Sequence, residues 1–353
     1  MLVTVLASCM QAHPSPNVHE PTNDLATRVE AYIQTVQDRY GIPGMALAIV
    51  HGGDPVYTGY HGYANLEHQV PVTDASIFRL YSLTKVMVSV GIFKLVEDGR
   101  LDLDASIATY LPAVPEAWRA VQIRHLLAHA SGLPDMVGRT PLELRDLTDD
   151  EAIARVFSLP LSTAPGERFA YNQTNFWLLK TLIETVTEQS LDDFIIETQF
   201  LEASTDHVFF STDARDIILN RVTPYFPFAK GTLTIDHPYV AGSHMDAASG
   251  LHLRLDDLIQ WDERFRANTL ISEASKQAMW APFAYSHSDD LFTHSGNRID
   301  FQGGHGYGFS GSLSTIYYIF PDEDLSVMVL TNGLSDFYDM KAMVLDLAAI
   351  ATE

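Results

Sequence analysis

The segment from Ser82 to about Asp98 carries apolar side chains on nearly every side of a helical projection, and Gly99 closes it. A helix of this kind cannot lie on a protein surface, because almost its whole circumference avoids water. Other elements must therefore surround it. The 353 residues, of which 46% are hydrophobic, are enough to build that layer as one large domain or two smaller ones.

Strand patterns occur near both ends of the chain. Residues 45–50 and 56–60 flank a Gly-Gly-Asp-Pro turn and predict one hairpin. Residues 311–320 and 325–330 flank a Pro-Asp-Glu-Asp turn and are rich in β-branched and aromatic side chains, which predicts a second hairpin.

Helical patterns dominate the part of the chain between these hairpins, above all at residues 101–200. Strands at both ends with helices between them indicate one sheet assembled from both termini. We therefore expect an α/β (α+β) fold with an antiparallel sheet flanked by helices. The sheet subdomain is expected at residues 24–80 and 245–353, with a mostly helical subdomain inserted at about 81–244.

Ser82 opens the apolar helix, and Lys85 follows three residues later. Residues three apart share a helical face, so the hydroxyl and the ammonium can meet. A helix N-terminus favours negative charge on the serine oxygen, and burial promotes loss of the lysine proton. This pattern predicts a nucleophile, Ser82, with Lys85 as its base. The four letters alone also fit a serine that caps the helix beside an exposed lysine.

Further blocks in fixed order accompany this pair, and with them the chain resembles the serine β-lactamase-related superfamily. That group includes class C β-lactamases, D-alanyl-D-alanine carboxypeptidases and family VIII esterases. The blocks lie at residues 78–85, 95–103, 110–112, 123–127, 129–133, 165–169, 247–251, 256–258 and 327–332. The resemblance implies a single catalytic domain over residues 24–353 of the β-lactamase and penicillin-binding transpeptidase type. It also implies a site between the sheet and the helical subdomain, with no cofactor.

The second motif of this superfamily is Tyr-x-Asn, and Tyr171-Asn-Gln173 stands in its place. The resemblance implies that Tyr171 is a general base or proton relay, which requires a neighbouring cation such as Lys85. It also implies that Gln173 binds substrate with an amide one methylene longer than the usual one. A core tyrosine is the structural alternative.

The third motif, Lys-Thr-Gly or His-x-Gly on a strand beside the site, is altered here. His305-Gly-Tyr-Gly308 lies directly before the second hairpin and is the favoured match. His294-Ser-Gly296 fits the letters better but needs an extra loop. With the favoured register, the resemblance implies that His305 binds substrate and that the Gly308 N–H joins the Ser82 N–H in an oxyanion hole.

Two other patterns bear on metal or nucleophile chemistry. His125 and His129 are four apart, but residue 126 is leucine and no third ligand is evident, so we expect no metal. The Gly-x-Ser-x-Gly elbow of α/β-hydrolases does not occur in the sequence.

The N-terminus and the net charge bear on location and partners. Leu6-Ala-Ser-Cys9 has the form of a bacterial lipobox, although no basic residue precedes it. We expect residues 1–23 to be an export or lipoprotein leader and tether, with lipidation of Cys9 and a periplasmic or membrane-anchored protein. The formal net charge of −23 disfavours nucleic acid as a partner. Nothing in the sequence sets the oligomeric state.

The expected function is that of a serine hydrolase that forms an acyl-enzyme with ester or amide bonds. The substrate is a small molecule or a peptidoglycan-like compound. No Lys-Thr-Gly occurs in the chain, and a histidine is mostly neutral at pH 7. We therefore expect small esters or D-amino-acid peptides to be better substrates than β-lactams. A catalytically inactive scaffold that binds peptidoglycan or a partner protein is the alternative.

Overall fold

The computed structural model describes residues 24–137, 148–213, 215–228, 232–235, 242–287, 292–294, 296–312, 314–333 and 339–353. The leader expected at residues 1–23, with Cys9, lies outside this range.

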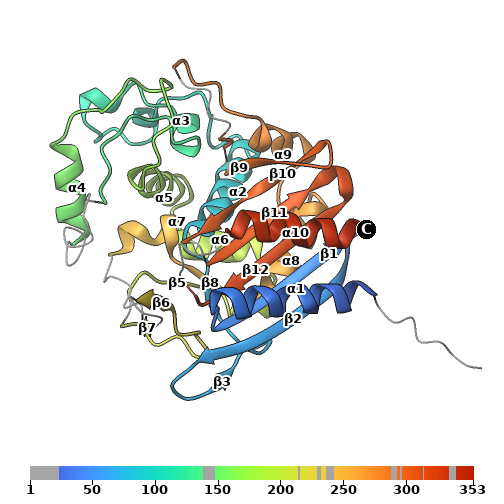
Figure 1. The fold of residues 1–353 in the computed structure, drawn as a ribbon. Coiled ribbons are helices and arrows are strands. Elements are labelled where there is room, and N and C mark those ends of the chain that lie inside the picture. The colour runs from blue at the N-terminus through green and yellow to red at the C-terminus, as the bar shows by residue number, and fades with distance from the viewer. Residues whose placement is uncertain are drawn as a thin grey trace, which may run out of the picture.

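A seven-stranded sheet forms the centre of the fold, and all of its strand pairs are antiparallel. Its order is β3-β2-β1-β12-β11-β10-β9, so strands from the two ends of the sequence meet where β1 pairs with β12 (Figure 1). This confirms the expected fold class. The strands are β1 (Gly44–His51), β2 (Asp54–Asn65), β3 (Val70–Pro71), β9 (Asn297–Phe301), β10 (Gly304–Gly311), β11 (Thr315–Phe320) and β12 (Leu325–Thr331).

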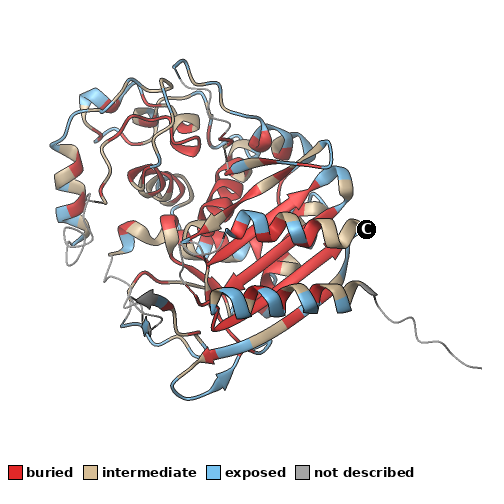
Figure 2. Ribbon diagram, in the orientation of Figure 1, coloured by how far each residue is buried: buried red, intermediate tan, exposed pale blue. Residues whose placement is uncertain are grey.

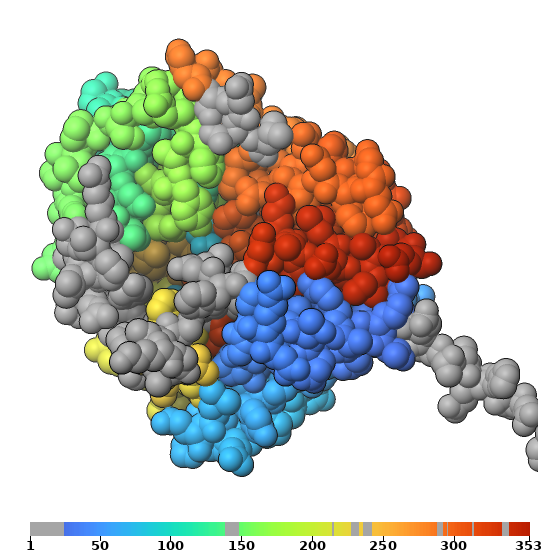
Figure 3. All heavy atoms as spheres, viewed as in Figure 1, coloured from blue at the N-terminus to red at the C-terminus, as the bar shows by residue number. Residues whose placement is uncertain are grey.

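Side chains of β1 alternate between two hydrophobic cores. Leu47 and Ile49 belong to the core beneath α1 (Asp24–Tyr40) and α10 (Met340–Thr352). Ala46 and Ala48 point into the larger core on the opposite face, where their small size lets α8 (Leu255–Arg266) approach the sheet. Figure 2 shows the buried strands beneath the two covering helices, and Figure 3 shows α1 and α10 side by side over this face.

Most of the remaining elements form the helical side of the molecule, towards the left in Figure 1, whereas η8 is the turn between β11 and β12. Two small sheets, β4-β8-β5 and β6-β7, accompany the helices. The bounds are β4 (Phe78–Arg79), η1 (Tyr81–Leu83), α2 (Thr84–Glu97), η2 (Ile107–Thr109), η3 (Glu116–Trp118), α3 (Ile123–Leu127), α4 (Asp149–Phe157), α5 (Thr174–Thr187), α6 (Leu191–Gln199), η5 (Glu202–Ser204), β5 (Phe209–Phe210), β6 (Tyr225–Phe228), β7 (Thr232–Ile235), η7 (Ser243–Met245), α7 (Asp246–Ser249), β8 (Leu251–Leu253), α9 (Glu273–Trp280) and η8 (Pro321–Glu323).

The apolar helix is buried as expected, with α5, α6, α7 and α9 packed around it. Its first turn differs from the expectation, because Ser82 lies in the 3₁₀ turn η1 and α2 begins at Thr84. Gly91 lets α6 approach closely, since a Cβ at that position would lie 2.8 Å from Ile195 Cδ1. Within the described parts of the chain, no helix combines the length and the apolar character needed to span a bilayer.

Asp262 on α8 is fully buried beneath the sheet. The Tyr317 hydroxyl and Ser326 Oγ donate hydrogen bonds to its Oδ1 at 2.6 Å and 2.8 Å. Burial outweighs these two bonds and raises the pKa of Asp262 to about 6. The folded protein therefore holds a proton that an unfolded chain loses near pH 4. The stability from this proton is full below about pH 4 and is lost as the pH rises through about 6.

Asp262→Asn keeps an oxygen acceptor for both hydroxyl donors and removes the buried charge. We expect the variant to have a higher Tm than the unaltered protein at pH 8 and a similar Tm at pH 4, as measured by calorimetry. Glu263→Gln, on the exposed side of the same helix, is the matched control and should show no such pH-dependent gain. Equal Tm values for Asp262→Asn and the unaltered protein at pH 8 would contradict the assignment.

Candidate active site

The turn before Ser82 holds a non-glycine residue in the left-handed region, Tyr81 with φ 49°. This conformation is strained and persists only where its surroundings enforce it. Leu80 is fixed on both sides, because its N–H donates to the Leu251 carbonyl at 2.7 Å and its carbonyl accepts from Thr315 Oγ1 at 2.8 Å. The Arg79 guanidinium lies 4.8 Å from the centre of the Tyr81 ring. These contacts set the direction in which Ser82 leaves the turn.

Ser82 Oγ meets two of the side chains expected from the sequence. Lys85 Nζ donates to it at 3.3 Å, and the Tyr171 hydroxyl donates to it at 2.9 Å. Lys85 is buried beneath the turn, whereas Tyr171 is 37% exposed at the surface of the site. The structure therefore places an ammonium and a phenol within hydrogen-bond distance of the same hydroxyl, the arrangement needed for proton transfer from a serine.

Lys85 is held on several sides. Its Nζ donates to the Ala248 carbonyl at 2.7 Å and lies 5.0 Å and 5.2 Å from the ring centres of Tyr171 and Phe176. Burial is the largest influence and lowers the pKa of Lys85, against the smaller opposing effects of Tyr171 and Asp135. A lysine with a lowered pKa yields a neutral amine more readily, and a neutral amine can accept the Ser82 proton.

Gln173 lies immediately before α5, on the turn that carries Tyr171. Its backbone N–H donates to Asp135 Oδ1 at 3.1 Å. The same carboxylate oxygen accepts the Val137 N–H at 3.2 Å, so Asp135 ties this turn to the loop that follows α3. Asp135 was not singled out from the sequence.

Strand β10 enters the site in a different register from the one expected. His305 lies near the start of the strand and pairs with Asp300 of β9 (Nδ1–Oδ1 3.1 Å). Gly308 lies in mid-strand between Asn297 and Tyr318. The other end of the strand, Gly311, meets the turn at residues 80–82, here called the nucleophile turn. At about 3.3 Å per residue, His305 is roughly 20 Å along the strand from that end.

Gly311 is the residue that meets this turn. A Cβ at Gly311 would lie 2.0 Å from the Leu80 carbonyl oxygen and 2.9 Å from Tyr81 Cβ. Phe309, two residues earlier, has its ring centre 6.0 Å from that of Tyr171. The expected register is therefore wrong by four residues, and Phe309-Ser-Gly311 occupies the place assigned to His305-Gly-Tyr307.

The alternative match also lies elsewhere. His294 Nδ1 is 3.1 Å from the Ala278 carbonyl on α9, and its ring packs against Phe93 and Phe283. Ser295 of that alternative lies outside the described residues. Neither histidine considered for the third motif is therefore part of the site around Ser82.

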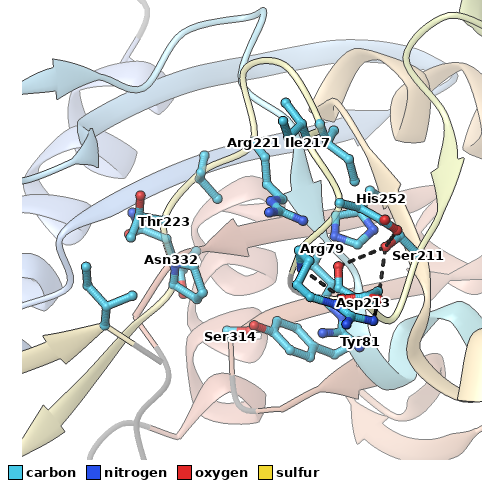
Figure 4. A pocket seen from close by; sticks show the side chains of 17 residues that line it. Arg79, Tyr81, Ser211, Asp213, Ile217, Arg221, Thr223, His252, Ser314 and Asn332 are labelled. Carbon is cyan, nitrogen blue, oxygen red and sulfur yellow. Dashed lines mark hydrogen bonds and ion pairs between the residues drawn. The ribbon is translucent and has the colours of Figure 1, made fainter. Parts of the chain in front are cut away.

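A cavity of about 420 Å³ lies beside the nucleophile turn (Figure 4). Arg79 and Tyr81 line it together with His252. Burial lowers the pKa of His252 to about 3, and the charges of Arg79 and Arg221 add to this effect, so the imidazole is neutral. The other residues that line the cavity are Ser211, Asp213, Arg215, Asp216, Ile217, Ile218, Arg221, Val222, Thr223, Pro224, Ile235, Ser314, Thr331 and Asn332. The cavity offers a space with both polar and apolar walls next to the residue that precedes Ser82.

The two histidines considered as zinc ligands do not share a helical face. His125 belongs to α3, where its Nδ1 accepts the Gln122 N–H at 3.1 Å. His129 follows the helix with φ 50° and is fully buried. Among the residues described, no group of three or more histidine, cysteine, aspartate or glutamate side chains could hold a metal ion.

Comparison with known proteins identifies similar sequences and folds. The family model described as Beta-lactamase matches residues 29–350. Penicillin-binding protein 4* of Bacillus subtilis (strain 168) is 26% identical over 74% of this chain and 61% of its own length. The chain spans 61–65% of the length of the first curated relatives it matches.

Two solved structures share the fold. The D-amino acid amidase of Ochrobactrum anthropi SV3, complexed with L-phenylalanine, superposes with a TM-score of 0.76 at 20% identity, covering 93% of this chain and 98% of its own. EstCE1, a hydrolase with promiscuous acyltransferase activity, superposes with a TM-score of 0.72 at 19% identity, covering 94% and 99%.

The hypothesis that Lys85 and Tyr171 share one proton path from Ser82 predicts that Lys85→Ala and Tyr171→Phe each lower kcat for an activated ester by about a thousandfold. The double variant should be little worse than either single variant, since groups that act as a unit give non-additive losses. Steady-state kinetics on the three proteins measures this. A double variant whose loss is the product of the two single losses would show that the residues act independently.

Proposed function

The chain belongs to the beta-lactamase family, and from this membership and the geometry at Ser82 we propose that it is a serine hydrolase acting on uncharged esters or amides. Ser82 Oγ attacks the carbonyl carbon while Lys85, as the neutral amine, takes the hydroxyl proton. Tyr171 passes that proton to the leaving alcohol or amine as the acyl-enzyme forms. Water then attacks the acyl-enzyme and restores Ser82.

The oxyanion of each tetrahedral intermediate requires two donors. The Ser82 N–H, in the turn η1 that leads into α2, is one candidate. The backbone N–H of Ser312, directly after the glycine that contacts the nucleophile turn, is the second. Two preorganised backbone donors of this kind contribute about 2.7–4 kcal/mol each to the stabilisation of a transition state.

Phe309 carries the proposal that the substrate is uncharged. In class C β-lactamases, the lysine of the third motif lies beside the substrate carboxylate, whereas here a phenyl ring packs against Tyr171 and against Phe292 (ring centres 5.8 Å apart). The whole of β10, Gly-His-Gly-Tyr-Gly-Phe-Ser-Gly, contains neither lysine nor arginine. Losing a charge-assisted contact costs about 1.5–3 kcal/mol, or roughly ten- to hundredfold in affinity.

The net charge of the chain and the names of two similar structures also support an uncharged ester or amide as the substrate. The formal net charge of −23 repels anionic substrates. The names of the two similar structures refer to an amidase and to a hydrolase with acyltransferase activity. We assign the cavity beside Tyr81, about 420 Å³ in volume, to a substrate group larger than acetyl.

The test is the ratio of kcat/KM for p-nitrophenyl butyrate to that for nitrocefin and for a D-Ala-D-Ala peptide. We expect the neutral ester to be preferred by at least about tenfold. Phe309→Lys should shift the ratio towards the two carboxylate substrates, whereas Phe309→Leu, the apolar control, should leave it near its original value. Circular dichroism verifies that both variants are folded. Preference of the unaltered protein for nitrocefin or the D-peptide would overturn the proposal.

A further inference from the structure

His129 lies directly behind the catalytic phenol. Its ring is fully buried, with its centre 4.4 Å from that of Tyr171 and the two planes tilted by 43°. Three further aromatic side chains, those of Phe169, Phe176 and Phe292, also pack around the ring. His129 also has φ 50°, in the left-handed region that few residues other than glycine adopt.

One ring nitrogen of His129 receives two hydrogen bonds. The backbone N–H of Asn172, next to Tyr171 in the sequence, lies 3.1 Å from Nδ1, and Asn175 Nδ2 lies 3.1 Å from the same atom. The Asn175 amide is oriented by Ser131, whose Oγ donates to Asn175 Oδ1 at 2.6 Å. A nitrogen that accepts from two donors carries no proton, so His129 is neutral with its proton on Nε2.

The groups around the His129 ring also favour the neutral imidazole. The charged group that faces it is Lys85 on α2, and the phenol beside it is Tyr171. Nε2 is buried and has no hydrogen-bond acceptor among the described residues. Burial and the nearby Lys85 charge both lower the pKa of His129 well below its ordinary value. Protonation would remove the acceptor for Asn172 and place a second cation behind Tyr171.

We propose that His129 is a positioning residue that holds the Tyr171 phenol against Ser82, by accepting the Asn172 N–H and packing its neutral ring on the phenol. This inference rests on the role of Tyr171 in the proposed function. The Asn172 bond fixes the backbone immediately after Tyr171, and the ring contact limits the rotation of the phenol away from Ser82. Errors of about 1 Å in such positions cost roughly a hundredfold in rate.

Two amide replacements separate this role from simple core packing. In His129→Asn the amide oxygen falls near the position of Nδ1, and asparagine tolerates the left-handed backbone. In His129→Gln the acceptor moves outward to the region of Nε2. We expect His129→Gln to lower kcat for p-nitrophenyl butyrate by about a hundredfold with KM changed less than about threefold. His129→Asn should retain at least about tenfold more kcat than His129→Gln.

The Tyr171→Phe background provides the decisive comparison. A residue that acts only by positioning the Tyr171 hydroxyl makes no contribution to kcat once that hydroxyl is absent. His129→Gln should therefore lower kcat by less than about threefold in the Tyr171→Phe background. An equal loss with and without the phenol, or equal kcat for the asparagine and glutamine variants, would overturn the inference. Thermal unfolding of each variant verifies that the comparison is made between folded proteins.

A readout that does not depend on activity is the ¹⁵N NMR signal of His129 in the Ser82→Ala protein. The inference predicts a neutral ring protonated on Nε2, unchanged from pH 5.5 to 8.5. Titration of His129 within this range, or a proton on Nδ1, would contradict it. This NMR result does not depend on Ser82. Full esterase activity of Ser82→Ala would refute the proposed function, but it would not change the assignment of the His129 proton to Nε2.

Discussion

Burial of the Lys85 ammonium next to Ser82 is the constraint on which the rest of the structure depends. A buried lysine is costly unless its donors are satisfied or its proton is lost. Here the Ala248 carbonyl and the faces of two aromatic rings surround it. Supplying these groups requires α5 and α7 to pack against α2. The packing of the helical side of the molecule therefore surrounds the Lys85 side chain.

The nucleophile turn joins this enclosure to the sheet. Tyr81 has a strained backbone, and the strain is maintained by contacts with β8, β11 and the last glycine of β10. Since the same turn positions Ser82, any movement between sheet and helices would alter the distance from Ser82 Oγ to Lys85 or Tyr171. The buried β1–β12 pairing at the centre of the sheet gives this junction a rigid support.

Local patterns were sufficient for the fold and for part of the site. The all-round apolar helix and the two hairpins predicted the sheet-and-helix arrangement because burial and turn chemistry act over short distances. The spacing of Ser82 and Lys85 predicted their meeting for the same reason. Tyr171 is far away in sequence and was located through ordered blocks that resemble a family, a signal that spacing alone does not supply.

The third motif could not be placed because β10 is rich in glycine and its strand pattern is weak. The sequence therefore suggested a hairpin starting at Gly311, whereas β10 ends there and a short turn leads to Thr315. This four-residue difference replaces an expected imidazole by Phe309. The role of His129 could not be predicted from the sequence either, because it depends on a left-handed backbone and on hydrogen bonds from a turn about 40 residues away.

The central claim is that Ser82 becomes acylated during turnover. Rapid-quench mass spectrometry of the protein with p-nitrophenyl butyrate, followed by peptide mapping, measures this directly. The account predicts a butyryl adduct, on Ser82 alone, that forms with the first release of nitrophenol. Turnover with no adduct under conditions that trap one in a known serine hydrolase, or an adduct on another residue, would contradict it.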